Sequence, residues 1–245
     1  MAQGDFGPVT DDPGAWIGAT RYIDKDHPRV QAVALDLSSG HSSDRDKVLA
    51  IFQFVRDRIK FGFTRGFWDN RASDVLASRT GYCNTKSTLF VALLRAVDIP
   101  ARQVFVDIDR QVLYGLLDPG TPYVDHSYVE TYIDGAWVAT DSYIVDADLF
   151  TPAQARVRSE GHLMGYGVHA TGTLDWDGRS PAFSQFTALD ERPISTRHWG
   201  VYQDVGDFYR RADRPWNRLN PLLRVSVGAF GVSINQRADR IRASG

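Results

Sequence analysis

The spacing of apolar residues predicts two helices in the first hundred residues, the second of which begins at the only cysteine of the chain. After the N-cap signal Ser42-Ser43-Asp44, apolar side chains recur every three or four positions, so an amphipathic helix is expected to end near Lys60. The same spacing follows Cys83 directly, and Pro100 disfavours helical geometry in the residue before it. The second helix should therefore run from Cys83 to about Val97.

Strand signals follow the second helix and predict an antiparallel sheet. Residues 103–108 are a strand by composition, and residues 127–133 form a β-rich segment of alternating character. Asp134-Gly135 is a strong two-residue hairpin turn, after which residues 136–140 return as the partner strand. Residues 109–123 are expected to be a long connection. Helices and antiparallel strands together indicate an α+β protein.

The remaining segments predict an arm and an extension around one core. Gly and Pro interrupt the first forty residues, so residues 1–40 are expected to pack as an arm on a core formed by residues 41–150. Residues 151–245 are interpreted as a mixed extension of the same globule. Its expected elements are a helix that starts at residues 151–153, a glycine-punctuated stretch over 161–178, a helix over 204–211 and a last helix from Pro221. The apolar half of the last helix is expected in the core, with an oligomer contact as the alternative.

Composition restricts the class of protein and its partners. Of the 245 residues, 43% are hydrophobic and 24% are charged, which is typical of a soluble globular protein. A net charge of -2 gives no reason to expect nucleic acid or an anionic membrane as a partner. One cysteine excludes an internal disulfide, and neither a signal peptide nor a membrane span is indicated. We therefore expect a cytoplasmic protein.

Two kinds of site are not expected from the residue spacing. The histidines form no cluster with metal-ligand spacing, so no metal site is predicted. Residues 165–172 contain several glycines but no lysine, and they lack the strand-to-helix context of a phosphate-binding loop. No cofactor is predicted.

Cys83 is the first candidate for chemistry. Its position at the start of a helix exposes it to unpaired N–H groups and to the positive end of the helix dipole, which lower the pKa of a thiol. A lone cysteine is also often a small buried hydrophobic residue. Position alone leaves both interpretations open.

The predicted hairpin supplies the partners that a nucleophilic thiol would need. His126 opens its first strand and Asp141 closes its second. Because residues equidistant from the turn face each other, Asp141 should lie opposite Ser127 or Tyr128, within a residue or two of His126. A carboxylate in hydrogen-bond reach would fix the tautomer of the imidazole. The three residues together favour a nucleophile, its base and the group that orients the base.

These residues resemble the transglutaminase-like superfamily of papain-like cysteine enzymes. The shared pattern is a Gly-x-Cys at a helix start, an I-P-A-R-like exit, a His-x-x-Val-Glu strand and a Gly-x-Trp-x-x-x-Asp return, found here at residues 81–83, 99–102, 126–130 and 135–141. The resemblance covers about 100 residues, from Asp44 to Asp141. It implies a papain-like core in which the Cys83 helix packs across an antiparallel sheet. The sequence differs from that of the cross-linking members of the family: tryptophan usually follows their cysteine, whereas Asn84 follows Cys83 here.

The resemblance implies acyl transfer, with Cys83 as nucleophile, His126 as general base and acid, and Asp141 orienting His126. The expected substrate is a peptide, a protein or a small acyl or amide compound. Hydrolysis of an amide or peptide bond is favoured, while amine transfer, a biosynthetic acyltransferase or cyclase, and a non-catalytic binding domain of the same fold are the alternatives.

Three further residues are candidates near the site. Trp68 and Asn70 lie upstream of the cysteine and are guesses for the second oxyanion donor, beside the backbone N–H of Cys83. Lys86 follows Cys83 by three residues on the helix and could support a thiolate. The alternative for Lys86 is an exposed or salt-bridged helix lysine.

Overall fold

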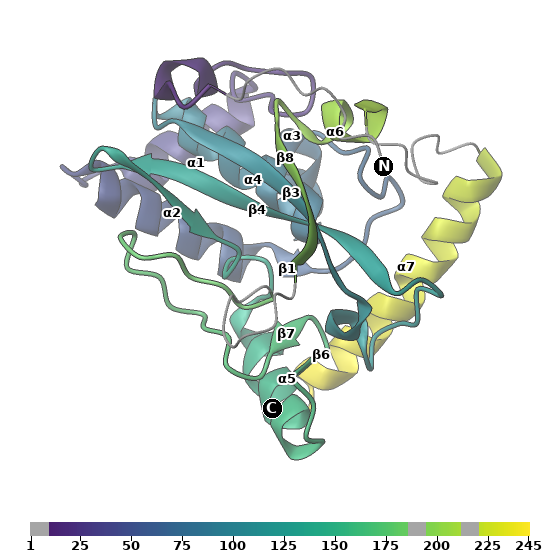
Figure 1. Cartoon of the computed structure of the whole chain (residues 1–245). Coiled ribbons are helices and arrows are strands. Elements are labelled where there is room, and N and C mark those ends of the chain that lie inside the picture. The colour runs from purple at the N-terminus through teal and green to yellow at the C-terminus, as the bar shows by residue number, and fades with distance from the viewer. Residues whose placement is uncertain (1–9, 186–194, 212–220) are drawn as a thin grey trace.

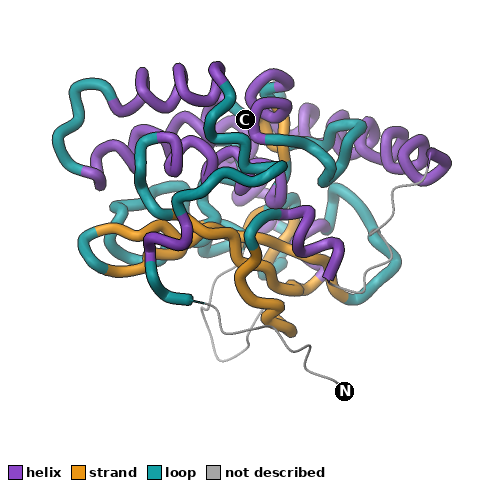
Figure 2. Tube along the Cα trace, turned by 90° about the horizontal axis from the view of Figure 1, so that it is seen from above, coloured by secondary structure: helices purple, strands orange, loops and turns teal. Residues whose placement is uncertain are grey.

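A computed structural model describes residues 10–185, 195–211 and 221–245. Most helices lie on one side of the main sheet, so the molecule has a helical layer and a sheet layer (Figures 1 and 2). The main sheet has the strand order β5-β4-β3-β8, and each neighbouring pair is antiparallel. Its strands are β3 (Ala101–Asp109), β4 (Tyr123–Ile133), β5 (Ala136–Thr140) and β8 (Ser195–Tyr202). The predicted α+β class with an antiparallel sheet is confirmed.

The β4–β5 hairpin has the turn and the register that the sequence predicts. Asp134 and Gly135 both have positive φ, 52° and 86°, as the two central residues of a type I′ turn require. Ile133 pairs with Ala136, and Val129 pairs with Thr140 at the open end. The register therefore brings the residues before Val129 close to those after Thr140.

Seven α-helices are described, together with two 3-10 turns and four two-residue strands. The α-helices are α1 (Pro28–Ser38), α2 (Asp44–Arg58), α3 (Ala72–Ser78), α4 (Cys83–Ala96), α5 (Ala147–Ser159), α6 (Val205–Arg211) and α7 (Pro221–Arg242). The other elements are η1 (Pro13–Trp16), η2 (Arg110–Leu113), β1 (Lys60–Phe61), β2 (Thr80–Gly81), β6 (Met164–Gly165) and β7 (Val168–His169).

Two helices depart from the sequence prediction. The pattern did not indicate α1, which packs against α2 and α4. The prediction that α5 begins at residues 151–153 is wrong, because the side chain of Asp146 accepts a hydrogen bond from the backbone N–H of Leu149 and starts the helix at Ala147. Strand β8 was also not predicted.

Helix α4 is the centre of the fold. Helices α1, α2 and α3 pack on it from one side, and strands β3 and β4 pack on it from the other. Every side chain from Cys83 to Arg95 is buried, the polar ones included. The helix is therefore enclosed all round, although its sequence pattern is amphipathic.

Residues beyond 150 contribute to the same core as α4. Val157 of α5 and Ile234 and Ala238 of α7 belong to the main hydrophobic cluster. Phe230 and Val232 of α7 are 44% and 55% exposed, so the expectation that this apolar stretch is buried is wrong at these two positions. The expectation for the apolar side chains at 222, 223, 225 and 227 falls on side chains that the structure does not describe. No helix among the described residues has the length and apolar character to cross a membrane.

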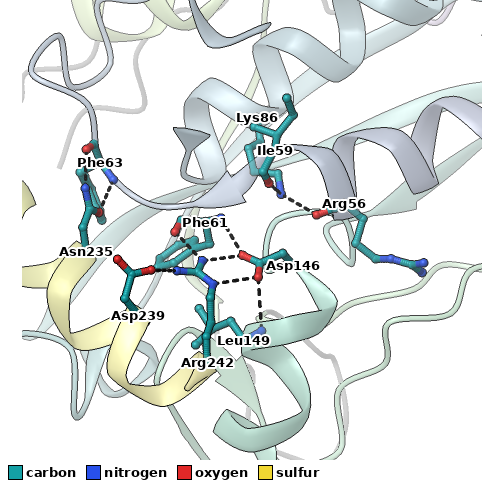
Figure 3. A network of polar contacts seen from close by, with 10 residues as sticks. All are labelled: Arg56, Ile59, Phe61, Phe63, Lys86, Asp146, Leu149, Asn235, Asp239 and Arg242. Atoms are coloured by element: carbon teal, nitrogen blue, oxygen red, sulfur yellow. Dashed lines mark hydrogen bonds and ion pairs between the residues drawn. The ribbon is translucent and has the colours of Figure 1, made fainter. Parts of the chain in front are cut away.

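A buried ion pair joins α7 to α5 and β1 (Figure 3). Arg242 donates two hydrogen bonds, of 2.9 and 2.6 Å, to the carboxylate of Asp146, and one of 2.8 Å to the carbonyl of Phe61. The backbone N–H of Phe61 donates to the same carboxylate. Burial alone would raise the pKa of Asp146, but Arg242 outweighs it and holds the pKa below its ordinary value.

We predict that Arg242→Ala lowers the free energy of unfolding at pH 7 by about 3–5 kcal/mol, because it leaves Asp146 buried without its charge partner. A lowered carboxyl pKa stabilises the fold above the unfolded value of about 3.9, and this stability is lost as pH falls through the folded pKa. The variant should therefore unfold at a higher pH during acid titration. Urea unfolding and acid titration by circular dichroism measure both effects.

Arg240→Ala is the matched control, because Arg240 is exposed on the same helix. Equal losses of stability in the two variants would contradict the predicted contribution of the Arg242–Asp146 pair to the free energy of unfolding.

Candidate active site

Cys83 is the first residue of α4, as predicted, and follows the N-cap residue Tyr82. The N–H groups of a first helical turn have no intrahelical partner, so they point toward the space in front of the cysteine. The side chain of Thr85 accepts a hydrogen bond of 3.0 Å from the backbone N–H of Tyr82 and fixes this start of the helix. Cys83 is 8% exposed, so its sulfur is largely withdrawn from solvent.

His126 and Asp141 meet at the open end of the β4–β5 hairpin, and the predicted hydrogen bond between them is confirmed. His126 Nε2 lies 3.0 Å from Asp141 Oδ2, and both side chains are buried. The other carboxylate oxygen of Asp141 accepts hydrogen bonds from the backbone N–H groups of Ser184 and Gln185. The Asp141 carboxylate is therefore held from two directions, and Nδ1 is the imidazole nitrogen that can exchange a proton with a substrate or a thiol.

A pocket of about 260 Å³ brings the cysteine and the histidine together. Cys83 and His126 both line it, as does Gln185. The backbone N–H of Ser127, next to His126, acts on the Cys83 sulfur as a hydrogen-bond donor. The start of α4 and the open end of the hairpin therefore form one site, with Asp141 behind His126.

The charge state of the thiol differs from the sequence expectation. Burial raises the pKa of Cys83 above its ordinary value, and the Asp125 carboxylate raises it further. The backbone N–H groups of Ser127 and Asn84 act in the opposite direction but do not compensate. The expectation of a lowered pKa is therefore wrong for this arrangement, because desolvation outweighs the helix start. The raised pKa favours the protonated thiol form of Cys83.

A second set of polar residues adjoins Cys83, and sequence analysis missed it. Asp125 Oδ2 accepts hydrogen bonds of 2.6 Å from the hydroxyl of Tyr209 and 3.0 Å from the side-chain amide of Asn84. The Cys83 thiol lies 3.6 Å from Asn84 Oδ1. Tyr209 comes from α6, more than a hundred residues after the cysteine, so local sequence contains no signal for this contact. The position of Asp125 directly before His126 is the one sequence signal that could have indicated a role for Asp125 near the site.

Lys86 does not have the predicted role near the thiol. It is fully buried, and its ammonium group donates hydrogen bonds to the carbonyl oxygens of Ile59 and Arg56, of 2.6 and 3.3 Å (Figure 3). These contacts place it at the C-terminal end of α2, where cations are favourable. Burial lowers the pKa of Lys86 to about 7. These contacts and this burial contradict two expectations for Lys86: that it supports a thiolate at Cys83, and that it is exposed.

Trp68 and Asn70 lie in the loop before α3 and are not among the described residues that line the Cys83 pocket. The Trp68 ring stacks on Tyr209 with centroids 4.7 Å apart. The Asn70 side chain accepts from the hydroxyl of Thr64 and donates to the carbonyl of Phe67, contacts that fix the loop. Trp68 therefore reaches the site through Tyr209, while Asn70 stabilises its own loop. Among residues that the structure describes, no group of His, Cys, Asp and Glu could hold a metal ion.

We predict that Asp125→Asn lowers the pKa of Cys83, because it removes a negative charge that disfavours the thiolate. At a pH below the pKa, each unit of decrease raises the thiolate fraction about tenfold and lowers the intrinsic nucleophilicity of the thiolate about threefold, so alkylation by iodoacetamide should accelerate about threefold. The rate is measured from pH 6 to pH 10 by intact-protein mass.

Asp118→Asn is the control for this test, since Asp118 lines the same pocket but is exposed and paired with Arg110. An unshifted pH profile of the alkylation rate in Asp125→Asn, or the same shift in both variants, would show that the Asp125 carboxylate does not raise the pKa of Cys83.

A family model matches the part of the chain that contains the site. The chain matches the family model described as Transglutaminase-like superfamily over residues 31–142, a range that contains Cys83, His126 and Asp141. A search of curated proteins found no match. Among solved structures, a "Putative Cysteine Protease" from Cytophaga hutchinsonii aligns with a TM-score of 0.44 and 24% identity, over 54% of this chain and 42% of that one.

A "putative protease" from Parabacteroides distasonis aligns with a TM-score of 0.35 and 16% identity, over 52% of this chain and 24% of that one. The chain thus spans less than half the length of either structure. The family model, the order of its motifs and the antiparallel sheet behind α4 lead to one assignment. Residues 31–142 of this chain belong to the transglutaminase-like superfamily.

Proposed function

We propose that this protein is a cysteine-dependent acyl-transfer enzyme that hydrolyses an amide or peptide bond through a thioester on Cys83. The observation that carries the proposal is the buried His126–Asp141 hydrogen bond of 3.0 Å at the wall of the pocket that contains Cys83. A nucleophile, its base and the group that orients the base are the parts that covalent acyl transfer requires. Membership of residues 31–142 in the transglutaminase-like superfamily supports the same reaction class.

In the first half of the reaction, His126 Nδ1 takes the proton of the Cys83 thiol as the sulfur attacks the substrate carbonyl. The hydrogen bond from Nε2–H to Asp141 keeps Nδ1 unprotonated before this step and stabilises the imidazolium after it. The backbone N–H of Cys83, at the start of α4, is one donor to the oxyanion. Collapse of the tetrahedral intermediate breaks the bond from carbon to nitrogen, and His126 gives its proton to the leaving amine.

In the second half, water resolves the thioester. His126 takes a proton from the water, the new oxygen–carbon bond forms, and the bond from carbon to sulfur breaks. The carboxylic acid leaves, and the proton returns from His126 to the sulfur. An amine in place of water would give transfer instead of hydrolysis.

We predict that a panel of acyl p-nitroanilides and p-nitrophenyl esters adds an acyl mass to the acid-quenched protein. Cys83→Ala should show no adduct and background turnover. His126→Gln should lose roughly 10²–10⁴-fold in rate, because it removes general acid and base catalysis. His41→Gln is the matched control, since His41 is exposed and outside the site, and should keep the rate.

Turnover that persists in Cys83→Ala would exclude the thioester. Equal losses in the His126 and His41 variants would exclude His126 as the base.

We also predict that the carboxylic acid remains the main product when a small alkylamine is added at millimolar concentration. Quantifying acid and amide by liquid chromatography decides between water and amine as the acceptor. Amide in excess of acid would replace hydrolysis by amine transfer as the reaction, with the thioester step unchanged.

A further inference from the structure

The pocket beside Cys83 has an aromatic wall that begins at the nucleophile. Tyr82, which directly precedes the cysteine, lies nearly parallel to Phe63 and Phe67, with centroids 4.5 and 5.2 Å away and interplanar angles of 18° and 11°. Phe63 and Phe67 lie 6.0 Å from each other, so the three rings form one cluster. Phe61 meets Phe63 edge to face at 6.1 Å. All four side chains line the pocket. A flat apolar group in the pocket would therefore meet a preformed aromatic surface.

The remaining walls are aliphatic. Ile108 and Val124 come from the ends of β3 and β4, and Val112, Leu113 and Leu117 come from the connection between these strands. Phe230 of α7 completes the lining and is 44% exposed, so this side of the pocket borders solvent. Three parts of the chain that are distant in sequence thus contribute apolar surface to one cavity.

The charges of the pocket select against anions. Its described lining contains the carboxylates of Asp125 and of Asp118, the latter paired with Arg110 outside the lining, and no Lys or Arg. Asp125 lies close enough to raise the pKa of the Cys83 thiol, so a negative group bound beside the sulfur would meet the same carboxylate. An anionic substituent would lose hydration without gaining a partner.

The pocket has room for one group the size of a large side chain. Its volume of about 260 Å³ is just below the roughly 300–1,000 Å³ of sites that enclose whole drug-sized ligands. An aromatic or branched aliphatic side chain fits such a space, whereas a longer ligand must extend out of it.

We propose that this pocket binds a large uncharged apolar side chain, aromatic or branched, on the acyl side of the scissile bond. The acyl side is assigned because its substituent stays attached to the sulfur in the thioester, and the aromatic wall starts at the residue next to Cys83. The substrate class is therefore an amide or peptide of a hydrophobic amino acid or a comparable aryl-bearing acid. This inference rests on the proposed function.

A pair of covalent probes tests the selectivity. N-acetyl-phenylalanine chloromethyl ketone and N-acetyl-aspartate chloromethyl ketone differ only in the side chain that enters the pocket. Cys83 is the only cysteine, so intact mass with peptide mapping reports its adduct. The phenylalanyl probe should react at least about tenfold faster, because one methylene in an apolar pocket already contributes 10- to 200-fold.

A charge placed in the pocket should change this ratio. Leu117→Lys introduces a cation at the aliphatic wall and should shift the ratio of the two rates toward the aspartyl probe by tenfold or more. Leu163→Lys is the matched control, since Leu163 is an exposed leucine outside the pocket, and should leave the ratio unchanged. Because the ratio compares two probes on one protein, a general loss of reactivity cancels.

Binding to Cys83→Ala separates this proposal from the proposed function. N-acetyl-phenylalaninamide should show saturation-transfer NMR signals with this variant that the aspartate amide lacks. If neither probe labels Cys83 but the phenylalanine amide binds, the enzymatic proposal fails and the pocket assignment holds. Equal labelling rates in the native protein, or faster reaction of the aspartyl probe, would overturn the pocket assignment while leaving Cys83 as a nucleophile.

Discussion

The complete burial of α4 is the constraint on which the site depends. Six polar residues of this helix are at most 1% exposed, and a buried polar group without a partner costs about 1–3 kcal/mol. Each neighbouring element supplies partners: the carbonyls at the end of α2 for Lys86, Tyr143 for Ser87, and the start of β3 for Arg95. Because these contacts point in several directions, they fix the rotation and depth of α4, and with them the position of Cys83.

The hairpin provides the second half of the site by register. A type I′ turn at Asp134-Gly135 allows one pairing, and a slip of one residue would turn every side chain of β5 to the other face. With the observed pairing, Asp141 follows the last paired residue and reaches His126. The backbone of Ser184 and Gln185 then holds the other carboxylate oxygen of Asp141, so the region after α5 supports the site without contributing Cys83 or His126.

Local signals predicted the parts of the site that local structure determines. Pro100 and the apolar period defined α4, and the turn at Asp134-Gly135 defined the hairpin, because both depend on a few neighbouring residues. Strand β8, the burial of Lys86 and the contact of Tyr209 with Asp125 depend on which distant segments pack together, and no local pattern contains that information. The loop upstream of Cys83 made Trp68 a candidate for the second oxyanion donor, but tertiary packing places its ring on Tyr209.

The raised pKa of the Cys83 thiol bears on how its sulfur can react. Helix starts favour a thiolate, yet burial and Asp125 dominate here, so the helix start alone does not activate the sulfur. In the proposed reaction, activation comes from proton transfer to His126 during attack, and the Asp141 contact orients His126 for this step. A thiolate formed in this way inside an apolar pocket is poorly solvated and has a high intrinsic pKa, and nucleophilicity rises with pKa. The same desolvation that keeps the thiol protonated without substrate would therefore strengthen the nucleophile once His126 has taken the proton.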